Sequence, residues 1–141
     1  MRTFETAILI DGTRSRVWSV MADLSRWPEW TESIDEIEVV DDSELGPGSR
    51  IRIKQPKLPP SLMTITEWVE GQSFVWESRQ PGVRAVAFHT MVEREGGCEV
   101  QVGVRFSGFL SGLIGLVYGK LTQQYVEMEA AGLKAESEKA D

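Results

Sequence analysis

The chain has 141 residues, 41% of them hydrophobic, and a formal net charge of -7 at pH 7. A chain of this length and composition is expected to form one domain, residues 1–141, around a sizeable core. The acidic balance argues against nucleic acid and anionic membranes as partners, because both carry negative charge themselves.

The chain has few cysteine and histidine residues, which limits the metal sites and disulfides that it can form. Cys98 is the only cysteine and His89 the only histidine, which argues against the usual zinc sites and an internal disulfide, so no metal or cofactor is expected. Glycine-rich nucleotide-binding motifs and serine nucleophile motifs are absent. The start, Met1 to Glu5, lacks the apolar segment of a secretory signal, which favours a cytoplasmic location. The most apolar run, Phe106 to Tyr118, is shorter than the roughly 20 residues of a bilayer span, so no stable membrane insertion is expected.

The first quarter of the chain predicts one strand and two helices. Alternating apolar residues indicate a strand over Thr3 to Ile10. Thr13 is a good N-cap for a helix that runs to Ala22. Pro28 favours the start of a short second helix, Glu29 to Ser33. Three tryptophans fall in this region, and each buries a large apolar area when enclosed.

The middle of the chain has the pattern of an antiparallel sheet. Apolar alternation is interrupted by turns at Gly46-Pro47-Gly48, Gly71-Gln72 and Pro81-Gly82, and by a proline-rich loop, Gln55 to Ser61. A glycine pair, Gly96-Gly97, predicts the turn of a long hairpin. The predicted strands are Ile34 to Val40, Arg50 to Lys54, Leu62 to Glu70, Ser73 to Arg79, Val83 to Glu95 and Cys98 to Ser107.

A long helix is predicted over Phe109 to Ala135, followed by a charged and flexible tail, residues 135–141. Glycine in a helix costs about 0.5–1 kcal/mol, yet four of them lie on one stripe here. Either they let the helix approach the sheet closely, or they leave room for a ligand. The glycines of this stripe are Gly108, Gly112, Gly115 and Gly119.

This order of elements resembles the START/SRPBCC superfamily, the helix-grip fold, and is most similar to its polyketide cyclase/dehydrase and lipid-transport families. The resemblance covers essentially the whole chain. It rests on Val17-Trp18, Asp23, Trp27-Pro28-Glu29-Trp30, the strand pair Ile65-Thr66-Glu67 and Phe74-Val75-Trp76, and Gly96-Gly97. It implies an α+β fold in which a curved antiparallel sheet of about seven strands wraps around the long C-terminal helix, with two short helices after the first strand.

The resemblance also implies a cavity between sheet and helix that holds a small hydrophobic or amphipathic molecule. A loop containing Leu58, Pro59 and Pro60 is similar in place and character to the gating loop of plant abscisic-acid receptors. The residues expected to line the cavity are Met63, Ile65, Phe74, Trp76, His89, Met91, Val102, Val104, Phe106, Leu113 and Val117.

Two polar residues are candidates for binding or catalysis. If Gly96-Gly97 forms a two-residue turn, Glu95 pairs with Cys98 and His89 faces inward opposite Val104. There it holds a ligand carbonyl or acts as a proton donor, or it is a structural histidine bonded to a neighbour. A register slip of one residue would instead turn His89 outward. Glu67 shares a face with Ile65 and Val69 by strict alternation, so it is an inward carboxylate that needs a partner. The alternative places Trp68 inward and Glu67 in water.

Three functions remain open at this stage. The first is a binding or transport protein for a lipid- or polyketide-like molecule. The second is a cyclase/dehydrase-like enzyme in which His89 and Glu67 transfer protons. The third is a protein-interaction module on the same scaffold. The sequence identifies neither the ligand nor the oligomeric state.

Overall fold

The computed structural model describes residues 2–41 and 44–139. Ten helices and strands lie within these ranges, and their order is the one predicted from the sequence. They are β1 (Arg2–Ile10), α1 (Arg14–Ala22), the 3-10 helix η1 (Leu24–Glu29), β2 (Glu36–Val39), β3 (Arg50–Lys54), β4 (Ser61–Val69), β5 (Ser73–Gln80), β6 (Val83–Arg94), β7 (Gly97–Ser107) and α2 (Ser111–Ser137).

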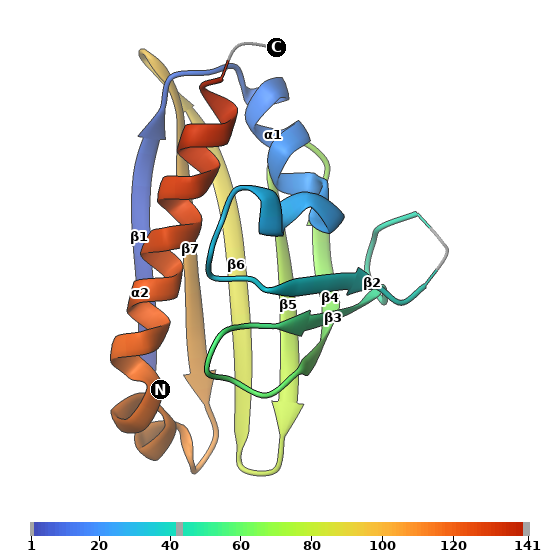
Figure 1. Ribbon diagram of the computed structural model, residues 1–141, viewed down its shortest axis with the longest axis vertical. Coiled ribbons are helices and arrows are strands. Elements are labelled where there is room, and N and C mark those ends of the chain that lie inside the picture. The colour runs from blue at the N-terminus through green and yellow to red at the C-terminus, as the bar shows by residue number, and fades with distance from the viewer. Residues whose placement is uncertain (1, 42–43, 140–141) are drawn as a thin grey trace.

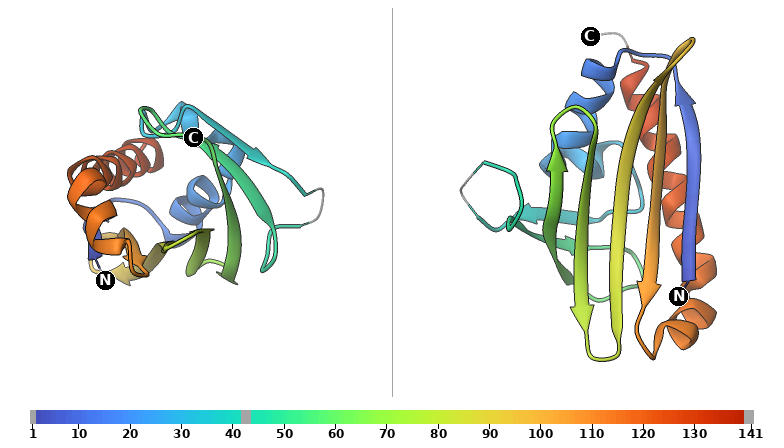
Figure 2. Two further views of the ribbon diagram at one scale, coloured as in Figure 1. Left: turned by 90° about the horizontal axis from the view of Figure 1, so that it is seen from below. Right: turned by 180° about the vertical axis from the view of Figure 1, so that it is seen from behind.

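The seven strands form one antiparallel sheet in the order β1-β7-β6-β5-β4-β3-β2. The sheet curves around α2, which runs along its concave side next to β1 and β7 (Figure 1). Helix α1 and η1 cover one end of the same concave side, as the view from below also shows (Figure 2). This arrangement is the helix-grip fold predicted from the order of elements, and it leaves the middle of the concave side between α2 and β3–β6.

The second short helix begins earlier than predicted. It spans Leu24–Glu29 with Pro28 inside it, and not Glu29 to Ser33. The indole of Trp27 is buried and donates from Nε1 to the carbonyl of Met21 at 3.0 Å, which holds the chain in a tight turn directly after α1. The amides of Trp30 and Thr31 both donate to the Trp27 carbonyl and end the helix there. A buried tryptophan, and not the proline, therefore sets the position of this helix.

A bulge in β4 changes the face on which its second half lies. The pairing with β5 shifts between Ile65 and Glu67, so one residue of β4 is left without a direct partner. As a result Trp68 is half-buried on the core side and Glu67 is exposed. Of the two alternatives for this strand, the structure has the one with Trp68 inward and Glu67 in water, because the inserted residue interrupts strict alternation.

The β6–β7 hairpin has a register two residues away from the predicted one. Arg94 pairs with Gly97, so the turn is Glu95-Gly96, and His89 lies opposite Val102 and not Val104. Gly96 and Gly97 have φ values of 87° and 150°. A shift of two residues preserves the face of a strand, and His89 does point inward, with 2% of its surface exposed.

The glycine stripe of α2 serves close packing. A Cβ on Gly115 would lie 2.8 Å from Cγ of Arg2, and one on Gly119 would lie 2.8 Å from Cζ of Phe4. These two glycines let α2 lie directly on β1. Nothing lies within 4 Å of a Cβ on Gly112, which faces open space.

The predicted flexible tail is wrong up to Ser137, since α2 continues to that residue. Arg16 of α1 donates to the carbonyls of Glu136 and Ser137, and Lys134 donates to the carbonyl of Leu9 at 2.9 Å. These bonds satisfy backbone groups at the end of α2. Residues 140 and 141 of the predicted tail lie outside the described ranges.

Glu77 joins β5 to β6 near the open end of the sheet. It accepts hydrogen bonds from Arg84 Nε at 2.6 Å and from Arg79 Nε at 3.1 Å. Burial raises the pKa of the Glu77 carboxyl, but the bonds and charges of Arg84 and Arg79 outweigh burial, so the pKa lies below its ordinary value.

We expect Glu77→Gln to cost about 1–3 kcal/mol of unfolding free energy at neutral pH. A carboxyl whose folded pKa is lowered stabilises the protein above its unfolded pKa, about 4.3 for glutamate, and loses this contribution as the pH falls through the folded value. The difference between the two proteins in urea unfolding should therefore shrink below about pH 4. Glu5→Gln is the control, because Glu5 is exposed. Among the described contacts, its carboxyl group accepts a hydrogen bond from Gln101 alone. A difference for Glu77→Gln that does not change with pH would contradict the assignment.

Candidate ligand cavity

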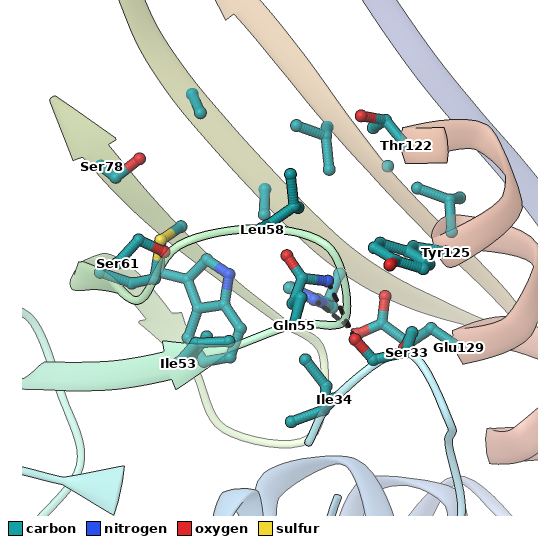
Figure 3. A pocket seen from close by; sticks show the side chains of 18 of the residues that line it. Ser33, Ile34, Ile53, Gln55, Leu58, Ser61, Ser78, Thr122, Tyr125 and Glu129 are labelled. Carbon is teal, nitrogen blue, oxygen red and sulfur yellow. Dashed lines mark hydrogen bonds and ion pairs between the residues drawn. The ribbon is translucent and has the colours of Figure 1, made fainter. Parts of the chain in front are cut away.

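A cavity of about 180 Å³ lies between the sheet and α2, with the β3–β4 loop across its front (Figure 3). Apolar cavities of roughly 150 Å³ are large enough to hold benzene. The walls come from η1, β3–β7 and α2, so the cavity draws on almost the whole fold. Its lining residues are Trp27, Ser33, Ile34, Ile53, Gln55, Leu58, Ser61, Met63, Trp76, Ser78, Ala85, Ala87, His89, Gly103, Val104, Phe106, Thr122, Tyr125, Val126 and Glu129.

His89 sits in the wall of this cavity inside an aromatic cluster. Its ring stacks on that of Phe74, with centroids 4.1 Å apart and planes 10° apart. Trp27 and Trp76 meet it edge-on at 5.6 and 5.4 Å. These rings fix the plane of the imidazole and so fix the directions in which its two nitrogens point.

The two nitrogens of His89 have different partners. Nδ1 lies 3.3 Å from the carbonyl oxygen of Phe74. A carbonyl only accepts, so Nδ1 carries the hydrogen of that bond. Nε2 lies 3.4 Å from Oε1 of Glu129 on α2. The attraction between Nε2 and the carboxyl group requires one proton between them, carried either by the imidazolium or by the carboxylic acid.

Glu129 is the functional residue that the sequence did not reveal. It lies on the stripe of α2 that faces the cavity, together with Thr122 and Tyr125 (Figure 3). Its side chain is 16% exposed, while that of His89 is 3% exposed. A signal was present in the sequence, because Thr122, Tyr125 and Glu129 recur at helical spacing, but an acidic residue at such a position usually faces water.

Hydroxyl and amide groups form the rest of the polar lining. Gln55 donates from Nε2 to the carbonyl of Ser33 at 3.2 Å, and the hydroxyls of Ser33 and Thr31 lie 2.7 Å apart. Thr122 donates to the carbonyl of Tyr118 at 2.8 Å. The cavity wall therefore offers oxygen and nitrogen atoms at several points around an apolar centre, and among its lining residues there is no lysine or arginine.

The β3–β4 loop, which the resemblance predicts as a gate, is bonded to α2. The hydroxyl of Tyr125 donates to the carbonyl of Pro56, which ties the β3–β4 loop to the helix. Burial, and then the charge of Asp35, raise the pKa of Tyr125, which keeps its hydroxyl protonated. Leu58 lines the cavity, whereas Pro59 and Pro60 are exposed. Of the three gate residues, only Leu58 forms part of the cavity wall.

The predicted lining residues fall into three groups. Met63, Trp76, His89, Val104 and Phe106 line the cavity. Ile65, Phe74, Met91 and Val102 are buried in the core without lining it. Leu113 and Val117 were predicted wrongly: they are 56% and 61% exposed on the outer face of α2, because Gly115 and Gly119 form the inner face there. The exposed Glu67 likewise lies outside the cavity.

Among the described residues, no three His, Cys, Asp or Glu side chains come together as a possible metal site. Within the same ranges no helix has both the length and the apolar content to cross a bilayer.

A sequence model of the family described as "Polyketide cyclase / dehydrase and lipid transport" matches residues 1–138. A search of curated protein sequences gives no significant match.

Several solved structures share the fold. TTHA0849 from Thermus thermophilus is 19% identical, with a TM-score of 0.78 over 96% of this chain and 97% of that one. A START superfamily protein from Mycobacterium smegmatis is 15% identical, with a TM-score of 0.77 over 96% and 97% of the two chains. The di-domain ARO/CYC BexL from the BE-7585A biosynthetic pathway is 18% identical, with a TM-score of 0.73 over 98% of this chain and 47% of BexL, so the chain spans about half of that protein.

Proposed function

The chain belongs to the polyketide cyclase/dehydrase and lipid-transport family, and from this premise we propose that it binds a small, uncharged, oxygen-bearing apolar molecule in the cavity between the sheet and α2. The observation that carries this proposal is the composition of the cavity wall. Aromatic and aliphatic side chains surround a centre that is edged by hydroxyls, one amide and the His89–Glu129 pair.

The charges of the lining support a neutral ligand. A buried carboxylate or phosphate needs a cation or several hydrogen-bond donors to offset its lost hydration. The lining has no lysine or arginine, and any positive charge on His89 is already matched by Glu129. A carbonyl or hydroxyl group carries no such cost and finds donors or acceptors on Ser33, Thr122 or Gln55.

The neutral fluorescent molecule 2-naphthol, which is small, apolar and carries one hydroxyl, is a suitable probe of this cavity. Ala87 is 8% exposed and lines the cavity. We expect Ala87→Phe to fill the space and to weaken probe binding by about tenfold or more, equivalent to about 1.4 kcal/mol. Fluorescence titration measures the affinity, and urea unfolding checks the fold.

The matched control is Ala7→Phe, since Ala7 lies exposed on β1. It should leave probe binding unchanged. Ala87→Phe should also cost little stability, because the ring enters existing space, whereas overfilling a packed core costs about 1–3 kcal/mol. A protein that binds the probe equally well after this substitution would show that the cavity is not the binding site, and one that unfolds because of it would show that there is no space beside Ala87 for the ring.

The His89–Glu129 pair favours a second candidate function, proton transfer in a cyclase/dehydrase-like reaction. A histidine whose ring nitrogen lies 3.4 Å from a carboxyl oxygen beside an apolar cavity is placed as a general acid or base. Under this hypothesis Glu129 is the carboxyl group that transfers protons, the role that the sequence analysis gave to Glu67. Loss of water from a β-hydroxyketone, followed by mass spectrometry, tests it. Equal rates for the wild type, His89→Ala and Glu129→Gln would remove the enzyme from consideration and leave the binding protein.

A further inference from the structure

The beginning of α2 and the residue preceding it expose large apolar side chains to solvent. We call Phe109, Leu113, Leu116 and Val117 the α2 patch. They are 87%, 56%, 77% and 61% exposed. Further along the same face the helix carries Lys120, Gln124 and Glu127, as a solvated helix does. Contiguous exposed apolar side chains of this size mark an interaction surface in a protein that otherwise buries them.

The α2 patch is held rigidly. Gly82, in the β5–β6 turn, accepts from the amide of Leu110 at 2.8 Å. A Cβ on Gly82 would lie 2.6 Å from a methyl carbon of Leu110 and 3.0 Å from the ring of Phe109, so the β7–α2 connection packs tightly on that turn. Exposed side chains on such a fixed base are preorganised for contact with a partner.

The charges around the α2 patch differ from those of the whole chain. Although the sequence has 22 acidic residues, residues 78–92 and 100–126 contain none. Two exposed cations border the patch instead. Arg2 lies against Gly115, and Lys120 follows the patch on the helix. The nearby Glu77 is already bound by two arginines, and Glu5 lies further along β1.

The α2 patch and the cavity lie on opposite sides of α2. Thr122, Tyr125 and Glu129 line the cavity, whereas the patch residues Leu113, Leu116 and Val117 are exposed on the outer face. In Figure 1 the start of α2, the end of β7 and the β5–β6 turn lie together at one end of the molecule.

We propose that the α2 patch docks reversibly on the surface of an anionic lipid bilayer. Phe and Leu enter the boundary between headgroups and acyl chains, while arginine and lysine at the rim meet lipid phosphates. The net charge of -7 does not prevent docking, because charges further away than a Debye length of about 10 Å are largely screened. The acidic residues Glu93, Glu95 and Glu138 lie at the other end of the sheet and of α2. A second copy of the chain is disfavoured as the occupant, because a symmetric contact would bring the same cations together.

Vesicle flotation tests this inference on the full chain. We expect binding to vesicles of equal parts phosphatidylcholine and phosphatidylglycerol, weaker binding to phosphatidylcholine alone, and a decrease as salt is raised. The double variant Phe109→Ser, Leu116→Ser should reduce the bound fraction by about tenfold or more. The control Leu9→Ser, Val92→Ser changes side chains that are 49% and 42% exposed elsewhere, and it should bind like the wild type.

Three results would overturn the inference. They are no flotation of the wild type with either vesicle, equal loss of flotation in both double variants, and a dimer by analytical ultracentrifugation that the patch variant converts to a monomer without any flotation. The last result would assign the α2 patch to a second copy of the chain. Probe binding in the cavity is measured without vesicles, so failure here would leave the proposed function intact.

Discussion

Replacing Gly132 by alanine should destabilise this protein by about 2–4 kcal/mol, whereas the same change at Gly112 should be neutral or stabilising within about 1 kcal/mol. Both glycines lie in α2. A Cβ on Gly132 would overlap the carbonyl oxygen of Trp30, lie 3.0 Å from its carbonyl carbon and lie 3.1 Å from its ring. A Cβ on Gly112 would have nothing within 4 Å.

The Trp30 backbone has little room to yield. Its amide donates to the Trp27 carbonyl at 3.0 Å, and the amide of Thr31 donates to the same oxygen. The indole rings of Trp27 and Trp30 pack together with their centroids 5.1 Å apart. To admit a methyl group, α2 must therefore move away from η1 as a rigid helix, and a displaced helix loses packing along its length.

This displacement also concerns the cavity, because Glu129 lies one turn before Gly132 and faces His89. Urea unfolding measures the loss of stability, and 2-naphthol titration measures the loss of the cavity. We expect weaker probe binding for Gly132→Ala even where the protein remains folded. If Gly132→Ala and Gly112→Ala unfold at the same urea concentration, the close contact between α2 and Trp30 is not a constraint on the fold.

Much of the fold follows from local signals in the sequence. The strand of alternating isoleucines at Arg50–Lys54 is found with the predicted bounds. The hydroxyl of Thr13 accepts from the amide of Arg16 at the start of α1, as predicted for an N-cap. In each case the signal that predicts the element lies within a few consecutive residues, so it can be recognised in the sequence.

The predictions fail where the local structure depends on contacts between residues that are far apart in the sequence. The bulge in β4 depends on pairing with β5, and it reverses the faces of Glu67 and Trp68. Trp68 then donates to Glu70 Oε2 at 3.0 Å, and Trp18 of α1 donates to Oε1 of the same carboxylate at 2.9 Å. One acidic residue thus satisfies two indoles from separate elements, and no local pattern predicts such a bond.

The candidate site was predictable only in part for the same reason. Inward strand positions such as Met63, Trp76 and His89 follow from alternation. The face of α2 that meets the sheet is set by Gly115 and Gly119 against β1, and this placed Leu113 and Val117 outside. Rotation of a helix that is apolar on all sides is fixed by its neighbours, and a hydrophobic pattern alone does not specify it.

The second large effect is expected at His89. Replacing it by leucine should cost about 3 kcal/mol of unfolding free energy, because Glu129 is left without its partner and the hydrogen bond to the Phe74 carbonyl is lost. Glu129→Leu alone should also lower the unfolding free energy, because Nε2 of His89 then faces an apolar group. The double substitution replaces both polar groups by apolar ones of similar size, and it should cost less than the sum of the two.

We expect the double-mutant cycle for His89 and Glu129 to give a coupling energy of about 1–3 kcal/mol by urea unfolding. The exposed pair Arg94 and Glu99, whose side chains are 54% and 40% exposed and whose atoms lie 3.1 Å apart, is the matched comparison. Its coupling should be about 0.2–1 kcal/mol and should fall with salt, because water screens both charges. The coupling of the buried pair should respond little to salt. Coupling energies that are equal for the two pairs would mean that the contact between His89 and Glu129 is no stronger than an exposed ion pair. The polar edge of the cavity would then have to be explained by its hydroxyl and amide groups alone.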